Sequence, residues 1–121
     1  MSDSERVFET ELADGVLVVI PVDQHIGFRE RQLQEQTNRV LQAIEQEDVQ
    51  SVVIDAANLS FLASRVIGAF IQIWETTLER GGRFVLCNLS DDALQGLIVT
   101  RLDTRWPTYA TRKEALAAIT V

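Results

Sequence analysis

The sequence predicts one α/β domain built around a mostly parallel β-sheet. Short apolar segments of strand length alternate with longer segments whose apolar residues repeat at helical spacing. The order is β-β-α followed by three further β-α units, giving β-β-α-β-α-β-α-β-α. Such alternation is typical of a layered domain whose strands are joined by right-handed crossovers. The 121 residues suit one domain with one core, and we expect 1–121 to form it.

The composition indicates a soluble cytoplasmic protein. The formal net charge is −7, so the basic excess that nucleic-acid binding requires is missing. No apolar stretch approaches the roughly 18–20 residues of a membrane span, and the N-terminus lacks the apolar segment of a secretory signal. One cysteine, Cys87, excludes an internal disulfide and fits a reducing compartment. It ends an apolar segment, which favours a core position.

The first two strands are expected at residues 7–12 and 16–20. Asp14 and Gly15 between them favour a tight hairpin turn, because both central residues of such a turn need a positive φ. The first strand is partly polar and is expected at an edge of the sheet, whereas the second is apolar throughout and is expected inside it. The following loop contains His25, which has no second candidate ligand nearby in sequence.

A first helix is expected from Phe28 to about Glu45. One of its faces collects Leu33, Thr37, Val40, Leu41 and Ile44. The unbroken apolar segment that follows, within residues 52–55, is typical of a parallel strand covered on both faces. This strand is expected at the centre of the sheet.

A second helix is expected over residues 64–80, ended by Gly81 and Gly82. Its main buried stripe is predicted to consist of Ile67, Ile71, Trp74 and Leu78, with Val66, Phe70 and Ile73 beside it. Trp74 should then be largely buried. The opposite face, with Gly68 and Ala69 near its start, should present a small, smooth surface to solvent.

The C-terminal third continues the alternation. Residues 83–87 form an apolar strand, and Ser90 precedes a short helix whose first turn is acidic. A short last strand is expected near Tyr109. Thr111 and Glu114 then have the spacing of a capping box that opens the terminal helix.

Ser64 stands where the second helix should begin, and its hydroxyl admits two interpretations. It could cap the helix by accepting a hydrogen bond from the first turn. The same N–H groups, with the helix dipole, could instead stabilise a phosphate on that hydroxyl.

The region around Ser64 resembles the signature of STAS domains, the small domains of bacterial anti-sigma-factor antagonists. Those antagonists typically read Asp-Leu-Ser, two hydrophobic residues, then Asp-Ser-Ser/Thr-Gly-Leu-Gly. The serine after the second aspartate is the one phosphorylated. Ser64 falls on that phosphoacceptor, and matches are also found at Leu59, Ser60, Ile67 and Gly68. The motif is degenerate, because departures occur at Asn58, Ala63, Arg65 and Val66.

The resemblance implies a STAS-like fold and a non-enzymatic signalling function, with no cofactor, metal or catalytic residue. The implied partner is an anti-sigma factor or serine-kinase-like protein, and a homodimer is compatible with it. The implied contact surface consists of Asn58, Ser60, Ser64, Arg65, Gly68 and Ala69. Phosphorylation of Ser64 would add about −1.5 to −2 charges to this contact and switch binding off.

Three alternatives remain open at this point. The departures at Ala63, Arg65 and Val66 are compatible with a constitutive adaptor or scaffold that needs no phosphorylation. A nucleotide- or lipid-binding module near the same loop is a second alternative. A small hydrolase using Ser64, His25 and Asp55 is the third, but the sequence contains no nucleophile elbow. Asp23 and Asp55 are expected to be solvated loop residues rather than a carboxylate pair at strand ends.

Overall fold

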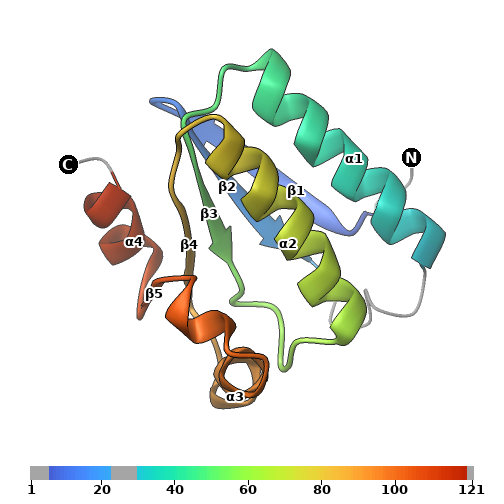
Figure 1. Cartoon of the computed structure of the whole chain (residues 1–121), viewed down its shortest axis with the longest axis vertical. Coiled ribbons are helices and arrows are strands. Elements are labelled where there is room, and N and C mark those ends of the chain that lie inside the picture. The colour runs from blue at the N-terminus through green and yellow to red at the C-terminus, as the bar shows by residue number, and fades with distance from the viewer. Residues whose placement is uncertain (1–5, 23–29, 120–121) are drawn as a thin grey trace.

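The computed structural model describes residues 6–22 and 30–119, so Asp23, His25 and Phe28 lie outside the described residues. Five strands form one sheet in the order β1-β2-β3-β4-β5, with β1 and β2 antiparallel and the other neighbours parallel (Figure 1). The strands are β1 (Phe8–Ala13), β2 (Val16–Pro21), β3 (Ser51–Asp55), β4 (Phe84–Cys87) and β5 (Thr108–Tyr109). The helices are α1 (Glu30–Gln46), α2 (Ser64–Glu79), α3 (Asp91–Val99), the short 3-10 helix η3 (Leu102–Thr104) and α4 (Arg112–Ile119). The predicted fold class and element order are confirmed.

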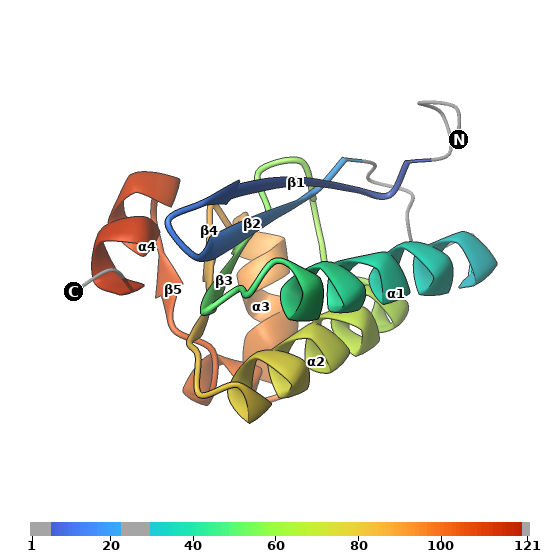
Figure 2. The ribbon, with the colours of Figure 1, turned by 90° about the horizontal axis from the view of Figure 1, so that it is seen from above.

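Helices cover both faces of the sheet. α1 and α2 lie side by side on one face, and α4 lies against the other (Figures 1 and 2). Residues of β3 alternate between these two cores: Val52 and Ile54 pack with α1 and α2, whereas Val53 packs with Ala115 and Ile119 of α4. Because both faces are buried, β3 needs apolar residues at consecutive positions, which explains its unbroken apolar run.

The N-terminal hairpin is confirmed, with β1 at the edge of the sheet. Asp14 and Gly15 both have positive φ values, 54° and 78°. This conformation matches the right-handed twist of two strands joined by a two-residue loop. Among the described strands β1 pairs only with β2, and five of its six residues are exposed.

α1 buries the predicted face, with one addition. Leu33, Thr37, Val40 and Ile44 are buried and Leu41 is half-buried. Gln36 is also buried, although its residue type predicts exposure. Its Oε1 atom accepts hydrogen bonds from the backbone N–H groups of Val7 and Phe8. This side chain therefore fixes the start of β1 to α1.

The predicted helical phase of α2 is wrong. The helix is continuous through Gly68, as expected, but its buried residues are Val66, Ala69, Phe70, Ile73 and Thr77. Leu78 is 49% exposed and Trp74 is only half-buried. The apolar residues of α2 cover a wide arc that contains both the Ile67 stripe and the Val66 stripe. Periodicity alone therefore does not show which of the two stripes lies at the centre of the buried face. Contact with the sheet and with α1 places Val66, Phe70 and Ile73 at that centre.

The C-terminus of α2 is confirmed at the two glycines. Gly81 has a φ of 77°, and its N–H donates to Leu78 O, while Gly82 N–H donates to Thr77 O. This pair of bonds satisfies carbonyl groups that a helix end otherwise leaves free. Glycine is also required at position 82, because a Cβ atom there would lie 1.6 Å from the Gln50 carbonyl oxygen.

Ser90 stands at the start of α3 as predicted, and one of the two bonds of the predicted capping box is observed at the start of α4. Ser90 Oγ accepts a hydrogen bond from Ala93 N at the start of α3, and Thr111 Oγ1 accepts one from Glu114 N at the start of α4. Between these helices lies Trp106, which is fully buried. Periodicity does not predict this burial, because Trp106 belongs to an irregular segment.

Candidate functional site

Ser64 is the first residue of α2 and is exposed to solvent. The residue at the capping position is Ala63, in extended conformation and without a side-chain cap, so the capping interpretation of Ser64 is wrong. The helix begins at Ser64 itself, one residue earlier than a capping role for Ser64 would require. The Ser64 hydroxyl forms no hydrogen bond with another described residue, and the first-turn N–H groups have no side-chain cap.

The loop before α2 is anchored from three sides. Asn58 Nδ2 donates to Pro21 O at 3.2 Å, and Ser90 Oγ donates to Ser60 O at 2.6 Å. Leu59 and Leu62 are buried, and Leu62 lies against Gly96 of α3. The loop is thereby held between β2, α3 and the core, so it presents a defined surface.

Phe61 lies in this loop and is 52% exposed. Sequence reasoning missed it as a surface residue, because Phe61 and Leu62 form one hydrophobic pair in the motif. The structure separates them: Leu62 points into the core and Phe61 is left at the surface. A large aromatic side chain at the surface beside Ser60 is the kind of residue on which protein contacts concentrate their binding energy.

Beyond Ser64, the surface continues into a shallow groove between α1 and α2. The groove has a volume of about 160 Å³. Arg65 and Gly68 line it from α2, and Arg65 Nη2 lies 3.8 Å from Glu30 Oε2 across it. Both side chains of that pair are largely exposed, so the ion pair contributes little to stability.

Five of the six predicted contact residues are at least partly accessible to solvent. Asn58, Ser60, Ser64 and Arg65 are exposed and Gly68 is half-buried. The predicted exposure of Ala69 is wrong, since only 3% of it is accessible. Ala69 belongs to the core and also lines the groove between α1 and α2, so it lies on the side of α2 that faces α1.

Asp55 is not the solvated loop residue that the sequence suggested. It is 4% exposed, and its two carboxylate oxygens accept three hydrogen bonds. The donors are Asn88 Nδ2 at 3.0 Å, Ala57 N at 3.2 Å and Arg112 Nε at 2.8 Å. Arg112 Nη1 in turn donates to Glu11 Oε2 at 2.7 Å. Sequence reasoning missed this cluster because its members come from four separate segments.

The pKa values around Asp55 follow from these contacts. Burial raises the pKa of Asp55, but the hydrogen bonds from Asn88, Arg112 and Ala57 outweigh it and leave the pKa lowered. Burial, followed by the charge of Asp55, raises the pKa of the neighbouring Cys87 thiol to about 12. A carboxylate engaged by three donors and a protonated thiol are suited to holding the fold together rather than to acid–base or nucleophilic chemistry.

Residues 6–22 and 30–119 contain no group of three or more histidine, cysteine or acidic residues that could hold a metal ion. None of the helices in these two ranges has the length and hydrophobicity of a transmembrane helix.

Comparison with known proteins assigns the family. The sequence model of the STAS domain matches residues 8–115. The fold is similar to that of an anti-sigma-factor antagonist (STAS) domain protein from Planctomyces limnophilus, with 27% identity, a TM-score of 0.81, and 94% of this chain and 98% of that chain covered.

Two further solved structures share the fold. One is a putative anti-sigma factor antagonist from Thermotoga maritima, with 17% identity, a TM-score of 0.83 and 97% of each chain covered. The other is the phosphorylated form of the Bacillus cell fate determinant SpoIIAA, with 19% identity, a TM-score of 0.72, and 93% of this chain and 98% of that chain covered. A comparison with curated protein sequences gave no significant match. Because the family model matches residues 8–115 of the 121-residue chain, the chain belongs to the STAS domain family.

Proposed function

We propose that this STAS domain is a non-enzymatic signalling module that binds an anti-sigma factor or serine-kinase-like protein through the surface around Ser64. The observation that carries the proposal is the exposed Ser64 hydroxyl at the first turn of α2, unused in capping and surrounded by an anchored loop. The contact surface consists of Asn58, Ser60, Phe61, Ser64, Arg65 and Gly68. This set differs from the one expected from sequence in two residues. Phe61 is added because it is exposed, and Ala69 is left out because it is buried.

Phosphorylation of Ser64 is the proposed switch. The helix start offers N–H groups and a dipole that favour a phosphate, and Arg65 adds a positive charge at the next position. The phosphate would place about −1.5 to −2 charges in the middle of the contact surface. A protein partner that fits the unphosphorylated surface would then meet both added bulk and a negative charge for which it offers no counter-charge, which costs several kcal/mol in an interface.

The test combines a kinase assay with a binding measurement on the parent protein, Ser64→Ala, Ser64→Asp and Ser60→Ala. Ser64→Ala should take up no phosphate and bind the partner as well as the parent does. Phosphorylated parent protein should bind at least about tenfold more weakly. Ser64→Asp should weaken binding less, because a carboxylate carries only one charge. Ser60→Ala should still be phosphorylated, since its serine precedes the helix by four residues.

Phe61→Ala examines the surface independently of phosphorylation. It should weaken partner binding by about tenfold or more without lowering stability, because the side chain is half-exposed. Gln95→Ala, an exposed position on α3, is the matched control. Phosphate incorporation into Ser64→Ala, or full binding by the phosphorylated protein, would contradict the switch. If the switch is contradicted in this way but Phe61→Ala still binds the partner more weakly than the parent, the results together would support the constitutive adaptor instead.

A further inference from the structure

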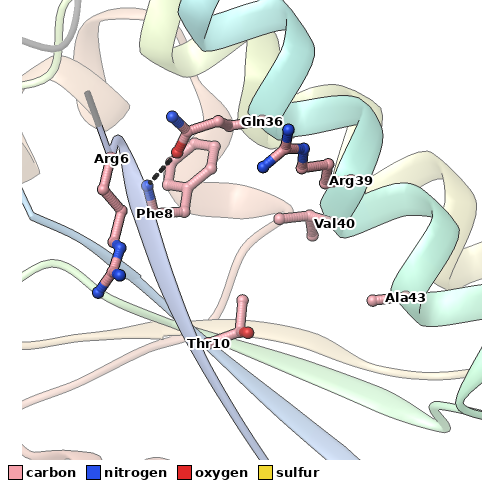
Figure 3. Close-up of a pocket in the computed structure, with 7 residues that line it drawn as sticks. All are labelled: Arg6, Phe8, Thr10, Gln36, Arg39, Val40 and Ala43. Atoms are coloured by element: carbon pink, nitrogen blue, oxygen red, sulfur yellow. Dashed lines mark hydrogen bonds between the residues drawn. The ribbon is translucent and has the colours of Figure 1, made fainter. Parts of the chain in front are cut away.

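A second concave surface lies between β1 and α1, outside the Ser64 surface. It has a volume of about 240 Å³, and its wall is formed by Phe8 and Thr10 of β1 and by Val40 and Ala43 of α1. Figure 3 shows Thr10 facing Val40 and Ala43 across the hollow. A more open hollow of about 520 Å³ shares Phe8 and Thr10 and follows β1 as far as Glu11. The concave surface is therefore elongated along the strand.

β1 also has backbone groups along this surface that pair with no other described strand. It is the edge strand, and its pairing with β2 begins at Ala13 and Val16 on either side of the two-residue turn. In an antiparallel pair, backbone groups point alternately toward the partner strand and away from it. The N–H and C=O groups of Thr10 and Leu12 consequently point away from β2. The equivalent N–H of Phe8 is taken by Gln36 Oε1 at 3.0 Å (Figure 3).

The charged residues that line the 240 Å³ hollow are both arginines, although the net charge of the chain is −7 and the more open hollow along β1 is also lined by Glu9 and Glu11. Arg39 lines the hollow from α1, and its guanidinium forms no ion pair with another described residue. Arg6 lines it from the other end and pairs with Glu9 at 3.2 Å in an exposed, readily exchanged contact. Glu11, on the opposite face of β1, is held by Arg112. An approaching carboxylate would thus meet Arg39 on the α1 side of the strand.

We propose that the β1 edge binds an extended acidic segment of a partner protein as an added strand. The main-chain groups of the segment would pair with Thr10 and Leu12, in the manner of other peptides that extend a sheet. One valine, leucine or isoleucine would enter the hollow, and an aspartate or glutamate two residues away, on the same face of the segment, would reach Arg39. The volume of about 240 Å³ suits a side chain better than a small molecule, whose sites usually span about 300–1,000 Å³.

A second copy of this chain fits the edge poorly. If the β1 strands of two copies paired antiparallel with Thr10 opposite Thr10, then Glu9 of each copy would lie opposite Glu11 of the other. If they paired about Glu11, that residue would lie opposite its own copy. Like charges directly across a strand pair are destabilising. The acidic residues of β1 therefore disfavour self-pairing, while the groove side of the strand favours an acidic partner.

The experiment is a selection of displayed random heptapeptides on the full chain. The enriched sequences should carry an aliphatic residue with an aspartate or glutamate two positions away. A fluorescent peptide of that pattern should shift the amide resonances of Thr10 and Leu12 in an NMR titration. Methylating its strand-pairing amide nitrogens should abolish binding.

Arg39→Glu should weaken binding of the selected peptide by about tenfold or more. Arg31→Glu is the matched control, since it makes the same charge change at an exposed site on α1 outside the hollow, and it should leave affinity within about twofold. Ser64→Asp should also leave it unchanged, so this proposal can fail or hold independently of the proposed function. Enrichment of unpatterned peptides, equal affinities of the two arginine variants, resonance shifts confined to residues 60–68, or dimers formed through β1 would each overturn the proposal.

Discussion

The Asp55 carboxylate links four separate parts of the fold from one buried position. It ends β3, accepts hydrogen bonds from Asn88 after β4 and from Arg112 of α4, and reaches Glu11 of β1 through that arginine. A buried carboxylate is tolerated in a fold only when its lone pairs are satisfied. Here they are satisfied by donors that only the folded chain brings together.

Asp55→Asn should lower the free energy of unfolding by about 2 kcal/mol at neutral pH. The amide loses the charge that Arg112 requires, although the exposed third of that arginine limits the cost. Chemical denaturation measures the change. Asp103→Asn, at an exposed position in η3, is the control and should alter stability by no more than about 0.5 kcal/mol.

The stability that Asp55 contributes should depend on pH. Its pKa is lower in the folded protein than the ordinary value of 3.8, so the unfolded chain takes up the proton first as the pH falls. The contribution is therefore complete above about pH 3.8 and is lost as the pH falls through the folded pKa. The difference in unfolding free energy between the parent and Asp55→Asn should shrink in acid. A constant difference from pH 7 into that range would contradict the assigned contacts.

Cys87 should be unreactive in the folded protein. It is fully buried, and its pKa is raised to about 12, so the nucleophilic thiolate is scarce at neutral pH. An aromatic disulfide reagent should label it slowly in buffer and fully in denaturing guanidinium chloride. Rapid labelling without denaturant would mean that the α4 side of the sheet opens readily.

At the scale of elements, Gly68 within α2 and Gly82 in the turn after it differ in whether the surrounding structure leaves room for a side chain. A Cβ atom at Gly68 would meet nothing within 4 Å, whereas one at Gly82 would meet the Gln50 carbonyl at 1.6 Å. Gly82 therefore sets how closely the turn after α2 can approach the start of β3. Gly68 is a helical position where glycine costs stability and keeps the surface near Ser64 small.

Gly82→Ala should destabilise the protein by more than about 2 kcal/mol, because backbone atoms must move to accept the methyl group. Gly68→Ala makes the same chemical change inside the helix and should raise stability by about 0.5–1 kcal/mol. Thermal denaturation of the two variants compares them directly. Equal effects would show that the turn after α2 is not packed as closely as the structure indicates.

At the scale of the whole molecule, Trp106 ties the C-terminal region to the core. Its ring centroid lies 6.5 Å from that of Phe70, 5.8 Å from that of Trp74 and 5.1 Å from that of Phe84. These partners come from α2 and β4, so the segment between α3 and β5 is held against both. Within the described residues, the Trp106 indole N–H is a buried side-chain donor without a hydrogen-bond partner, so the ring contacts are what hold this side chain in the core.

Trp106→Ala should cost about 3–5 kcal/mol of unfolding free energy, as expected for a large aromatic residue removed from a core. Trp74→Ala should cost clearly less, because Trp74 is half-buried at the margin of the same cluster. Each variant retains one tryptophan, so fluorescence-detected urea denaturation can follow both. A larger loss for Trp74→Ala would support the helical phase predicted from sequence and contradict the structure.

The sequence by itself determined the element order, the mostly parallel sheet and the ends of most elements. These features depend on local chemistry: Asp14 and Gly15 accept positive φ, Gly81 ends α2, and Ser90 caps α3 through its own hydroxyl. The sequence also pointed to Ser64 through the family motif around it. Such signals are readable because each depends on residues within a few positions of one another.

Only the tertiary structure decided which residues meet. The apolar arc of α2 was too wide to reveal its centre, so Ala69 was expected at the surface and lies instead against α1 and the core. The Asp55 cluster and the burial of Trp106 depend on segments separated by many residues, and composition does not encode their proximity. Burial at such positions is set by the packing of neighbouring elements rather than by the local periodicity of the chain.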